Sequence, residues 1–264
     1  MGSSLRVLRK RLLSGAAAAE GVAVVIDVLR AFTCAAFMMH LGAEKIVLLA
    51  EPEDVLRFKV ETGALAVGEV GGKMVGGFDL GNSPARIVAA SRGQFVGRTE
   101  AQRTSAGVTG AVAAARSAEQ VILGSFVTAS ATACYLQALS PPPEIVSLIA
   151  MGNAGRESTP DDEACASYLE HLLTGAAYSH SAALKQIVEH ECTQKFLRGD
   201  RVHFPPADPV YCLQRDLFDF CLTAQLEEGV LVARRINVPR RDKACLIYTS
   251  PSPRDCVSNR VCRL

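Results

Sequence analysis

Residues 21–27 read Gly-Val-Ala-Val-Val-Ile-Asp, a short apolar run rich in β-branched residues that ends in an acid. Such a run predicts a strand buried on both faces, because helices cover both sides of the sheet in α/β proteins. Residues 31–41 have the pattern of a helix that ends at Gly42, and residues 45–50 again resemble a strand. This strand–helix–strand order predicts parallel pairing of the two strands through a right-handed crossover.

The same alternation continues along the chain. Further strands are expected over 65–69, 95–102, 121–125 and 145–150, and helices over 52–61, 84–91, 107–118, 127–139, 161–173 and 182–197. Ser83 and Pro84 form the pair expected at a helix start, an N-cap followed by proline at the first helical position. The alternation predicts the α/β class, with a three-layer α/β/α arrangement around a mostly parallel or mixed sheet.

The N-terminal residues 1–20 differ from this body. They carry four basic residues within positions 6–11, then an alanine run, and no acid before Glu20. We expect an N-terminal extension that is disordered. An organellar targeting peptide has a similar composition and stays open as an alternative.

The C-terminal residues 240–264 differ as well. They contain five Arg, one Lys, three Cys and two Pro, and they follow no helical or strand period. We expect a tail that is disordered or foreign to the protein. The folded α/β domain is therefore expected over residues 21–239.

Composition excludes several classes of function. The net charge is +1 from 28 basic and 27 acidic residues, so no strong global field attracts nucleic acid or a membrane. Trp is absent and aromatic residues make up 6%, which disfavours a surface for stacking bases. The nine Cys are odd in number, which favours a reducing, cytoplasmic compartment. We expect a small-molecule partner, neither nucleic acid nor membrane, and leave a homo-oligomer open.

Polar side chains follow the predicted strands at the points where the strands end. Ligands in α/β proteins bind beyond the carboxyl ends of the strands, so these residues form one candidate site. Carboxylates are typical ligands of Mg²⁺, and Arg side chains and the glycine-rich segment 68–81 suit a phosphate group. Each position also has a structural explanation, because acids are favoured at helix starts and Asn can cap a turn. The residues are Asp27, Arg30, Glu69, Asp79, Asn82, Arg103, Thr104, Ser105, Asp161, Asp162 and Glu163.

Seven sequence blocks occur in a fixed order. They are VVIDVLRA (24–31), GEVGG (68–72), GFDLGNSP (77–84), QRTSAG (102–107), LGSF (123–126), DEACA (162–166) and YCLQRD (211–216). The ordered set, which covers about residues 21–220, resembles the 2-phosphosulfolactate phosphatase family of coenzyme M biosynthesis. The block FDLGNSP is the most specific of them.

The resemblance implies a phosphoric monoester hydrolase that uses Mg²⁺ to convert 2-phospho-3-sulfolactate into 3-sulfolactate and phosphate. It implies metal ligands at Asp27, Glu69 and Asp79. It also implies catalytic roles for Asp27, Arg30, Asp162 and Glu163, and substrate binding by Asn82, Arg103, Thr104 and Ser105. The acid that activates the water is left open between Asp162 and Glu163.

Departures from the family pattern keep other interpretations open. The segment 151–161 is longer than in the family before Asp162, and no clear first strand precedes residue 21. The alternative is a non-catalytic or retargeted relative that binds a small anionic metabolite. A fragment that does not fold alone is a third hypothesis. Residues 192–198 fit the pattern Cys-x5-Arg, but without the glycines of a phosphate-binding thiolate loop.

Overall fold

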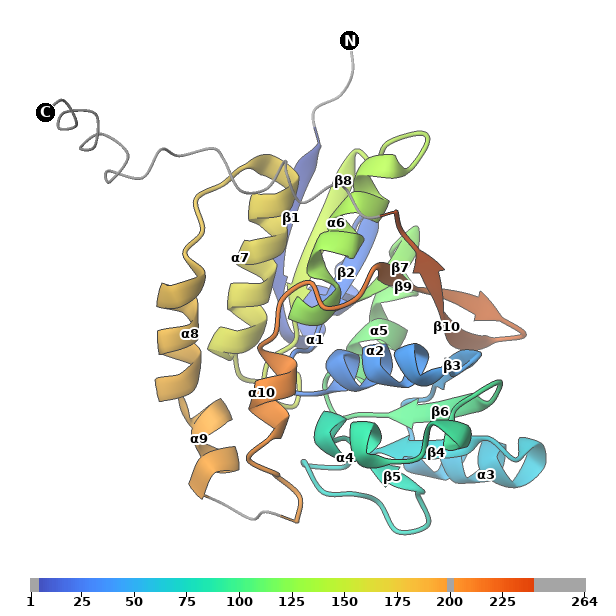
Figure 1. The fold of residues 1–264 in the computed structure, drawn as a ribbon. Helices are drawn as coiled ribbons and strands as arrows, with labels where there is room; N and C mark the ends of the chain where they lie inside the picture. The colour runs from blue at the N-terminus through green and yellow to red at the C-terminus, as the bar shows by residue number, and fades with distance from the viewer. Residues whose placement is uncertain (1–4, 199–201, 240–264) are drawn as a thin grey trace, which may run out of the picture.

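One mixed sheet runs through the computed structural model, which describes residues 5–198 and 202–239 (Figure 1). Within those residues ten strands pair in the order β1-β8-β2-β7-β9-β10-β3-β6-β4-β5. The strands are β1 (Arg6–Arg11), β2 (Val22–Ile26), β3 (Lys45–Leu48), β4 (Leu65–Gly68), β5 (Leu80–Gly81), β6 (Thr99–Arg103), β7 (Gln120–Gly124), β8 (Ile145–Ala150), β9 (Phe220–Glu227) and β10 (Val230–Asn237). The helices are α1 (Leu12–Ala17), α2 (Ala31–Leu41), α3 (Pro52–Thr62), α4 (Pro84–Ala89), α5 (Gly107–Ala114), α6 (Ala129–Ala138), α7 (Pro160–Thr174), α8 (His180–Glu189), α9 (Glu191–Arg198) and α10 (Asp208–Cys212).

The sheet consists of two parallel halves joined by an antiparallel hairpin. β1, β8, β2 and β7 are parallel to one another, as are β3, β6, β4 and β5. β9 and β10 lie between the halves and pair antiparallel with each other, with β7 and with β3. The expected parallel pairing of the strands at 21–27 and 45–50 is therefore wrong, because β2 and β3 lie in different halves. The hairpin itself was not predicted from the sequence.

The twist of the sheet brings the carboxyl ends of the two halves together. Three antiparallel pairings separate β7 from β3, so the halves run in opposite senses along the ladder. In the sheet order, β6 is the fifth strand after β2. Adjacent strands are twisted against each other by roughly 20–25°, so the axis of β6 is rotated by roughly 100–125° relative to that of β2. Figure 1 shows this as upright strands β1 and β8 and transverse strands β6 and β4.

Helices cover both faces of the sheet, so the predicted three-layer α/β/α fold is confirmed. Val22, Val24 and Ile26 of β2 pack in one apolar cluster with side chains of α6 and α7. Ala23 and Val25 face the opposite cluster, which contains side chains of α2 and α5. This alternation is the period of two that a buried strand imposes. The continuous apolar run at residues 22–26 is thus explained by burial of β2 on both faces.

The expectation of an extension over residues 1–20 is wrong for residues 5–20. Strand β1 pairs in parallel with β8 at the sheet edge, and α1 packs against α5. The basic side chains of β1 interrupt the apolar pattern by which a strand is predicted. In the structure, acidic side chains form ion pairs with them. Arg9 pairs with Glu163 and Glu170, and Lys10 pairs with Glu20. The expected tail at 240–264 lies outside the described residues.

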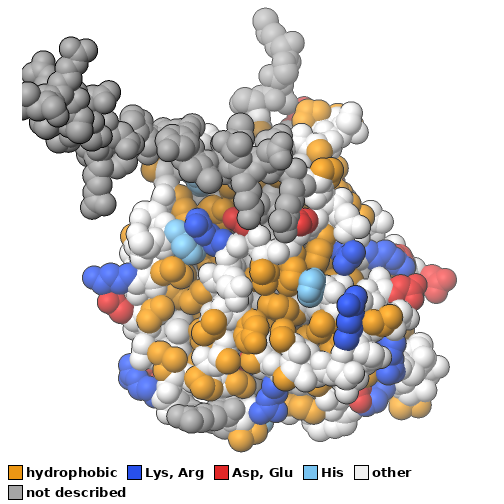
Figure 2. All heavy atoms as spheres, viewed as in Figure 1, with side chains coloured by type: hydrophobic (Ala, Val, Ile, Leu, Met, Phe, Trp, Pro, Cys, Tyr) orange, Lys and Arg blue, Asp and Glu red, His pale blue; other side chains and the backbone are white. Residues whose placement is uncertain are grey.

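The face seen in Figure 2 carries many apolar side chains, over the region where Figure 1 places α2, α4 and α10. Val88 of α4 and Val210 of α10 are among the exposed large apolar residues. Within the described residues, no helix combines the length and the hydropathy needed to cross a bilayer.

Candidate active site

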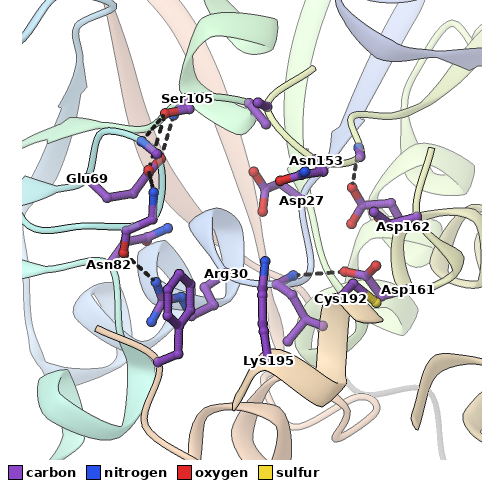
Figure 3. A pocket seen from close by; sticks show the side chains of 18 of the residues that line it. Asp27, Arg30, Glu69, Asn82, Ser105, Asn153, Asp161, Asp162, Cys192 and Lys195 are labelled. Atoms are coloured by element: carbon purple, nitrogen blue, oxygen red, sulfur yellow. Dashed lines mark hydrogen bonds between the residues drawn. The ribbon is translucent and has the colours of Figure 1, made fainter. Parts of the chain in front are cut away.

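A small pocket lies where the carboxyl ends of both halves of the sheet meet (Figure 3). About 100 Å³ of it is open to water-sized molecules. Its walls come from the loops after β2, β4, β6 and β8 and from α7 and α9. They are lined by Asp27, Leu29, Arg30, Glu69, Gly71, Gly72, Asn82, Ser105, Ala106, Gly152, Asn153, Ala154, Thr159, Asp161, Asp162, Cys192, Lys195, Phe196 and Phe204.

Asp27 directly follows β2 and is buried. Its Oδ1 accepts a hydrogen bond of 2.9 Å from the Ala31 N–H, and its Oδ2 accepts one of 2.8 Å from the Gly107 N–H. Burial raises the pKa of Asp27, and the nearby Asp161 and Glu69 carboxylates raise it further, while the two backbone donors lower it. The pocket therefore concentrates negative charge that a cation would stabilise.

Asp161 and Asp162 are buried in the first turn of α7. Asp162 accepts backbone hydrogen bonds of 2.7 Å from Val28 and from Gly152, so it ties the β2 and β8 loops together. Burial and the carboxylates of Asp161 and Asp27 raise the pKa of Asp162 well above its usual range. Oδ2 of Asp161 accepts from the Leu29 N–H at 3.2 Å, whereas its buried Oδ1 has no partner among the described residues.

Glu69 follows β4 and organises the glycine-rich loop. Its Oε1 accepts from the Ser105 N–H at 2.6 Å, and its Oε2 accepts from the Gly72 N–H at 2.5 Å and the Ser105 hydroxyl at 3.2 Å. The Ser105 hydroxyl also accepts from the Gly71 N–H at 3.2 Å. The expected phosphate donors of the loop, the amides of Gly71 and Gly72, are therefore already bonded. Gly72 has a φ of +83°, and a Cβ there would lie 2.5 Å from the Phe204 ring.

Arg30 is buried at the pocket wall and already paired. It donates to Oδ2 of Asp208 and to the His203 carbonyl, each at 2.8 Å, and to the Gly72 carbonyl at 3.3 Å. Its guanidinium lies 5.2 Å from the centroid of each of the Phe196 and Phe204 rings. The fully buried Asp208, which also accepts from the Ser83 hydroxyl at 2.7 Å, was not identified from the sequence.

Lys195 on α9 also lines the pocket and was not identified from the sequence. Figure 3 shows its side chain extending toward Asp27 and Asn153. Asn82, which was predicted as a site residue, also lines the pocket. Its buried amide oxygen has no hydrogen-bond partner among the described residues. An unpartnered buried atom needs an explanation, and at a pocket wall a bound ligand, ion or water would supply the partner.

Four of the predicted site residues do not line the pocket. Asp79 accepts from the Ala66 N–H at 2.8 Å and pairs with Lys59 at 2.7 Å, so its carboxylate is used elsewhere. Glu163 points away from the pocket and pairs with Arg9 and Arg11 of β1. Arg103 donates to the carbonyls of Ala50 and Glu69, and the Thr104 hydroxyl accepts from the Val108 N–H in the first turn of α5. These four support the framework around the pocket.

Cys192 lines the pocket, but its chemistry does not suit a thiolate phosphatase. Burial raises the pKa of the thiol to about 12, and the neighbouring Asp161 charge raises it too. The residue is part of α9 rather than of a loop. Arg198, the last residue of the Cys-x5-Arg pattern, is exposed and donates to Gln194 within the same helix.

The acids suit Mg²⁺ held by few protein ligands. Among the described residues, no three His, Cys, Asp or Glu side chains form a ready metal cage. Mg²⁺ is usually bound by one or two carboxylates, with waters and substrate phosphate as the other ligands. The unpartnered oxygen of Asp161 and the carboxylate of Asp27 are oxygen donors of this kind, and a divalent cation would relieve the repulsion between them.

Comparisons with known proteins agree on one family. The family model for 2-phosphosulpholactate phosphatase matches residues 7–226. The chain is 28% identical over 217 residues to a probable 2-phosphosulfolactate phosphatase of Bacillus subtilis. The aligned region covers 81% of this chain and 92% of that protein. A protein of the same description from Carboxydothermus hydrogenoformans is 33% identical over 226 residues, 81% and 91% of the two chains. One from Deinococcus radiodurans is 37% identical over 153 residues, 58% and 62% of the two chains.

Proposed function

The chain belongs to the 2-phosphosulfolactate phosphatase family, and we propose that it hydrolyses 2-phospho-3-sulfolactate to 3-sulfolactate and phosphate with Mg²⁺ as cofactor. The proposal is supported most by one observation. Carboxylates from three separate segments, Asp27, Glu69 and the Asp161–Asp162 pair, line one small pocket. Such a group of acids is typical of a site that handles a metal ion and a phosphate together.

In this proposal Asp27 and Asp161 hold the metal, and Asp79 has no part in it. Bound Mg²⁺ supplies positive charge that neutralises the transferred phosphoryl group. The hydrogen bonds from Ala31 and Gly107 fix the Asp27 carboxylate in one orientation. Fixed ligand orientation matters because catalysis of phosphoryl transfer depends on positioning and charge.

Asp162 is the proposed acid–base residue, and Glu163 is not. A carboxylate with a raised pKa accepts a proton from water more readily than an ordinary carboxylate, and burial and the acidic neighbours Asp161 and Asp27 raise the pKa of Asp162. Its two hydrogen bonds to the backbone hold the carboxylate in place. Asn82 and Ser105 are the proposed polar contacts to substrate, and Arg30 forms the wall behind it.

The wider setting belongs to the proposal as well. All six cysteines among the described residues are free, which suits a reducing, cytoplasmic compartment. We assign the reaction to coenzyme M biosynthesis, because the substrate of that step is the one in the family's description.

Release of phosphate from 2-phospho-3-sulfolactate, with and without Mg²⁺, tests the function. We expect turnover that chelation abolishes and added Mg²⁺ restores. Other 2-phosphorylated acids should be assayed in parallel to establish the preferred substrate. Binding of 3-sulfolactate without any phosphate release would instead support a non-catalytic member of the family.

A further inference from the structure

Two basic side chains, Arg30 and Lys195, line the pocket, and within the described part of the chain only Arg30 has a carboxylate partner. Arg30 pairs with Asp208 at 2.8 Å, and both side chains are buried, at 4% and 0% exposure. Asp208 does not line the pocket, so the charge of Arg30 is neutralised by a carboxylate outside the pocket. A buried, hydrogen-bonded pair of this kind acts as a neutral unit.

Lys195 is the other basic residue of the wall. Among the residues that the structure describes, no carboxylate lies within ion-pair distance of its ammonium. Its Nζ lies 5.6 Å from the centroid of the Phe196 ring and 5.3 Å from that of Phe204. Aromatic faces attract a cation without neutralising it. The two rings therefore hold the ammonium at the pocket while its charge stays available to a ligand.

The proposed substrate supplies the missing anion. A 2-phosphorylated acid carries, besides the phosphoryl group, at least one acidic group that is not transferred. Four carboxylates line the pocket, so binding of an anion there without a neighbouring cation would be strongly unfavourable. The proposed function assigns Asp27 and Asp161 to the metal that binds the phosphate, so the remaining anion needs a cation of the protein.

We propose that Lys195 binds an acidic group of the substrate other than the transferred phosphoryl group, either the sulfonate or the carboxylate. Lys195 thereby selects phosphate esters that carry such a second acidic group. This inference rests on the proposed function. The lysine acts as a point charge, which suits either group. Phe196 and Phe204 position it, and α9 forms the wall from which it reaches into the pocket (Figure 3).

The test compares Lys195→Met, which keeps the stem and removes the charge, with Lys195→Arg. Lys185→Met on the exposed surface of α8 is the matched control. Binding of 3-sulfolactate is measured by titration calorimetry, and steady-state rates are measured with 2-phospho-3-sulfolactate. Loss of a charge-assisted hydrogen bond should weaken binding and raise KM about ten- to hundredfold in Lys195→Met. The value of kcat should change much less, and Lys195→Arg should recover most of the affinity.

A second substrate identifies the group that is bound. If 2-phospholactate, which lacks the sulfonate, shows no penalty in Lys195→Met, the lysine binds the sulfonate; if the penalty remains, it binds the carboxylate. Wild-type affinity for 3-sulfolactate in Lys195→Met overturns the inference, as does the absence of 3-sulfolactate binding to the wild type. Because calorimetry needs no turnover, an inactive wild type would reject the phosphatase function and leave the role of Lys195 still measurable.

Discussion

Oδ2 of Asp27 accepts a hydrogen bond of 2.8 Å from the backbone N–H of Gly107, 80 residues further along the chain. The contact joins the end of β2 to the start of α5. A Cβ at position 107 would lie 2.8 Å from this oxygen and 2.8 Å from the Cβ of Ala31. The close approach of the backbone to the carboxylate therefore requires glycine here.

Gly107→Ala should displace the Asp27 carboxylate. A misplacement of about 1 Å can cost roughly 100-fold in rate, so we expect a loss of phosphatase activity of that order. Gly76→Ala is the control, because a Cβ there meets nothing within 4 Å. Full activity in Gly107→Ala would show that the orientation of Asp27 is unimportant.

Asp27→Asn and Asp79→Asn should differ sharply. Asp27→Asn removes a ligand charge at the pocket and should lower the rate by orders of magnitude, with weaker Mg²⁺ activation. Asp79→Asn loses a partly exposed pair with Lys59, which is worth about 0–1 kcal/mol, and should leave the rate near that of the wild type. Equal losses of activity in the two variants would contradict the assignment of the metal site to Asp27 and Asp161.

Glu100 should make stability depend on pH. The side chain is fully buried on β6, both carboxylate oxygens lack partners among the described residues, and burial raises its pKa to about 9. The folded state therefore holds the proton more tightly than the unfolded state. Its contribution is fully present below the unfolded pKa of about 4.5 and is lost as pH rises through about 9.

Relative to wild type, Glu100→Gln should gain on the order of 3 kcal/mol between pH 4 and pH 7. Chemical denaturation at several pH values measures the difference. The exposed Glu53→Gln on α3 serves as the control and should show little change with pH. A stability difference for Glu100→Gln that does not vary with pH would show that folding does not raise the pKa of Glu100.

Arg30 should contribute to stability as well as to function. Arg30→Met leaves Asp208 buried without a countercharge, a change that usually costs about 3–5 kcal/mol. Adding Asp208→Asn removes the unpaired charge and should recover much of the melting temperature. The double variant should still be impaired with 2-phospho-3-sulfolactate, because the pocket wall has changed. Failure of the second substitution to recover stability would show that the pair with Asp208 is not the main role of Arg30.

The sequence was sufficient to predict the layers and much of the pocket. Asp27 and Glu69 each follow an apolar run at a strand end, and Ser105 follows the strand predicted over 95–102, so their positions in the chain already indicate the functional edge of the sheet. The direction of a side chain was harder to predict. Successive residues of a helix point about 100° apart, so Asp161 and Asp162 face the pocket while Glu163 faces the arginines of β1.

Other features carried no sequence signal that separates them from ordinary structure. Lys195 lies on a short amphipathic helix, and a lysine there resembles any surface lysine. Asp208 precedes a proline at a helix start, where an acid is expected for local reasons. β1 contains four basic residues, and only its pairing with β8 and the acids around it show why they are compatible with a strand.

The hairpin of β9 and β10 fills the centre of the sheet although it comes last among the described strands. On the ribosome, both flanking halves emerge before the strands that join them. Asp27 belongs to one half and Glu69 to the other, so the complete constellation of acids can assemble only after residue 237 has left the exit tunnel. Until then the nascent chain has two open sheet edges, at β7 and β3, which makes this the stage of biosynthesis at which a chaperone would matter most.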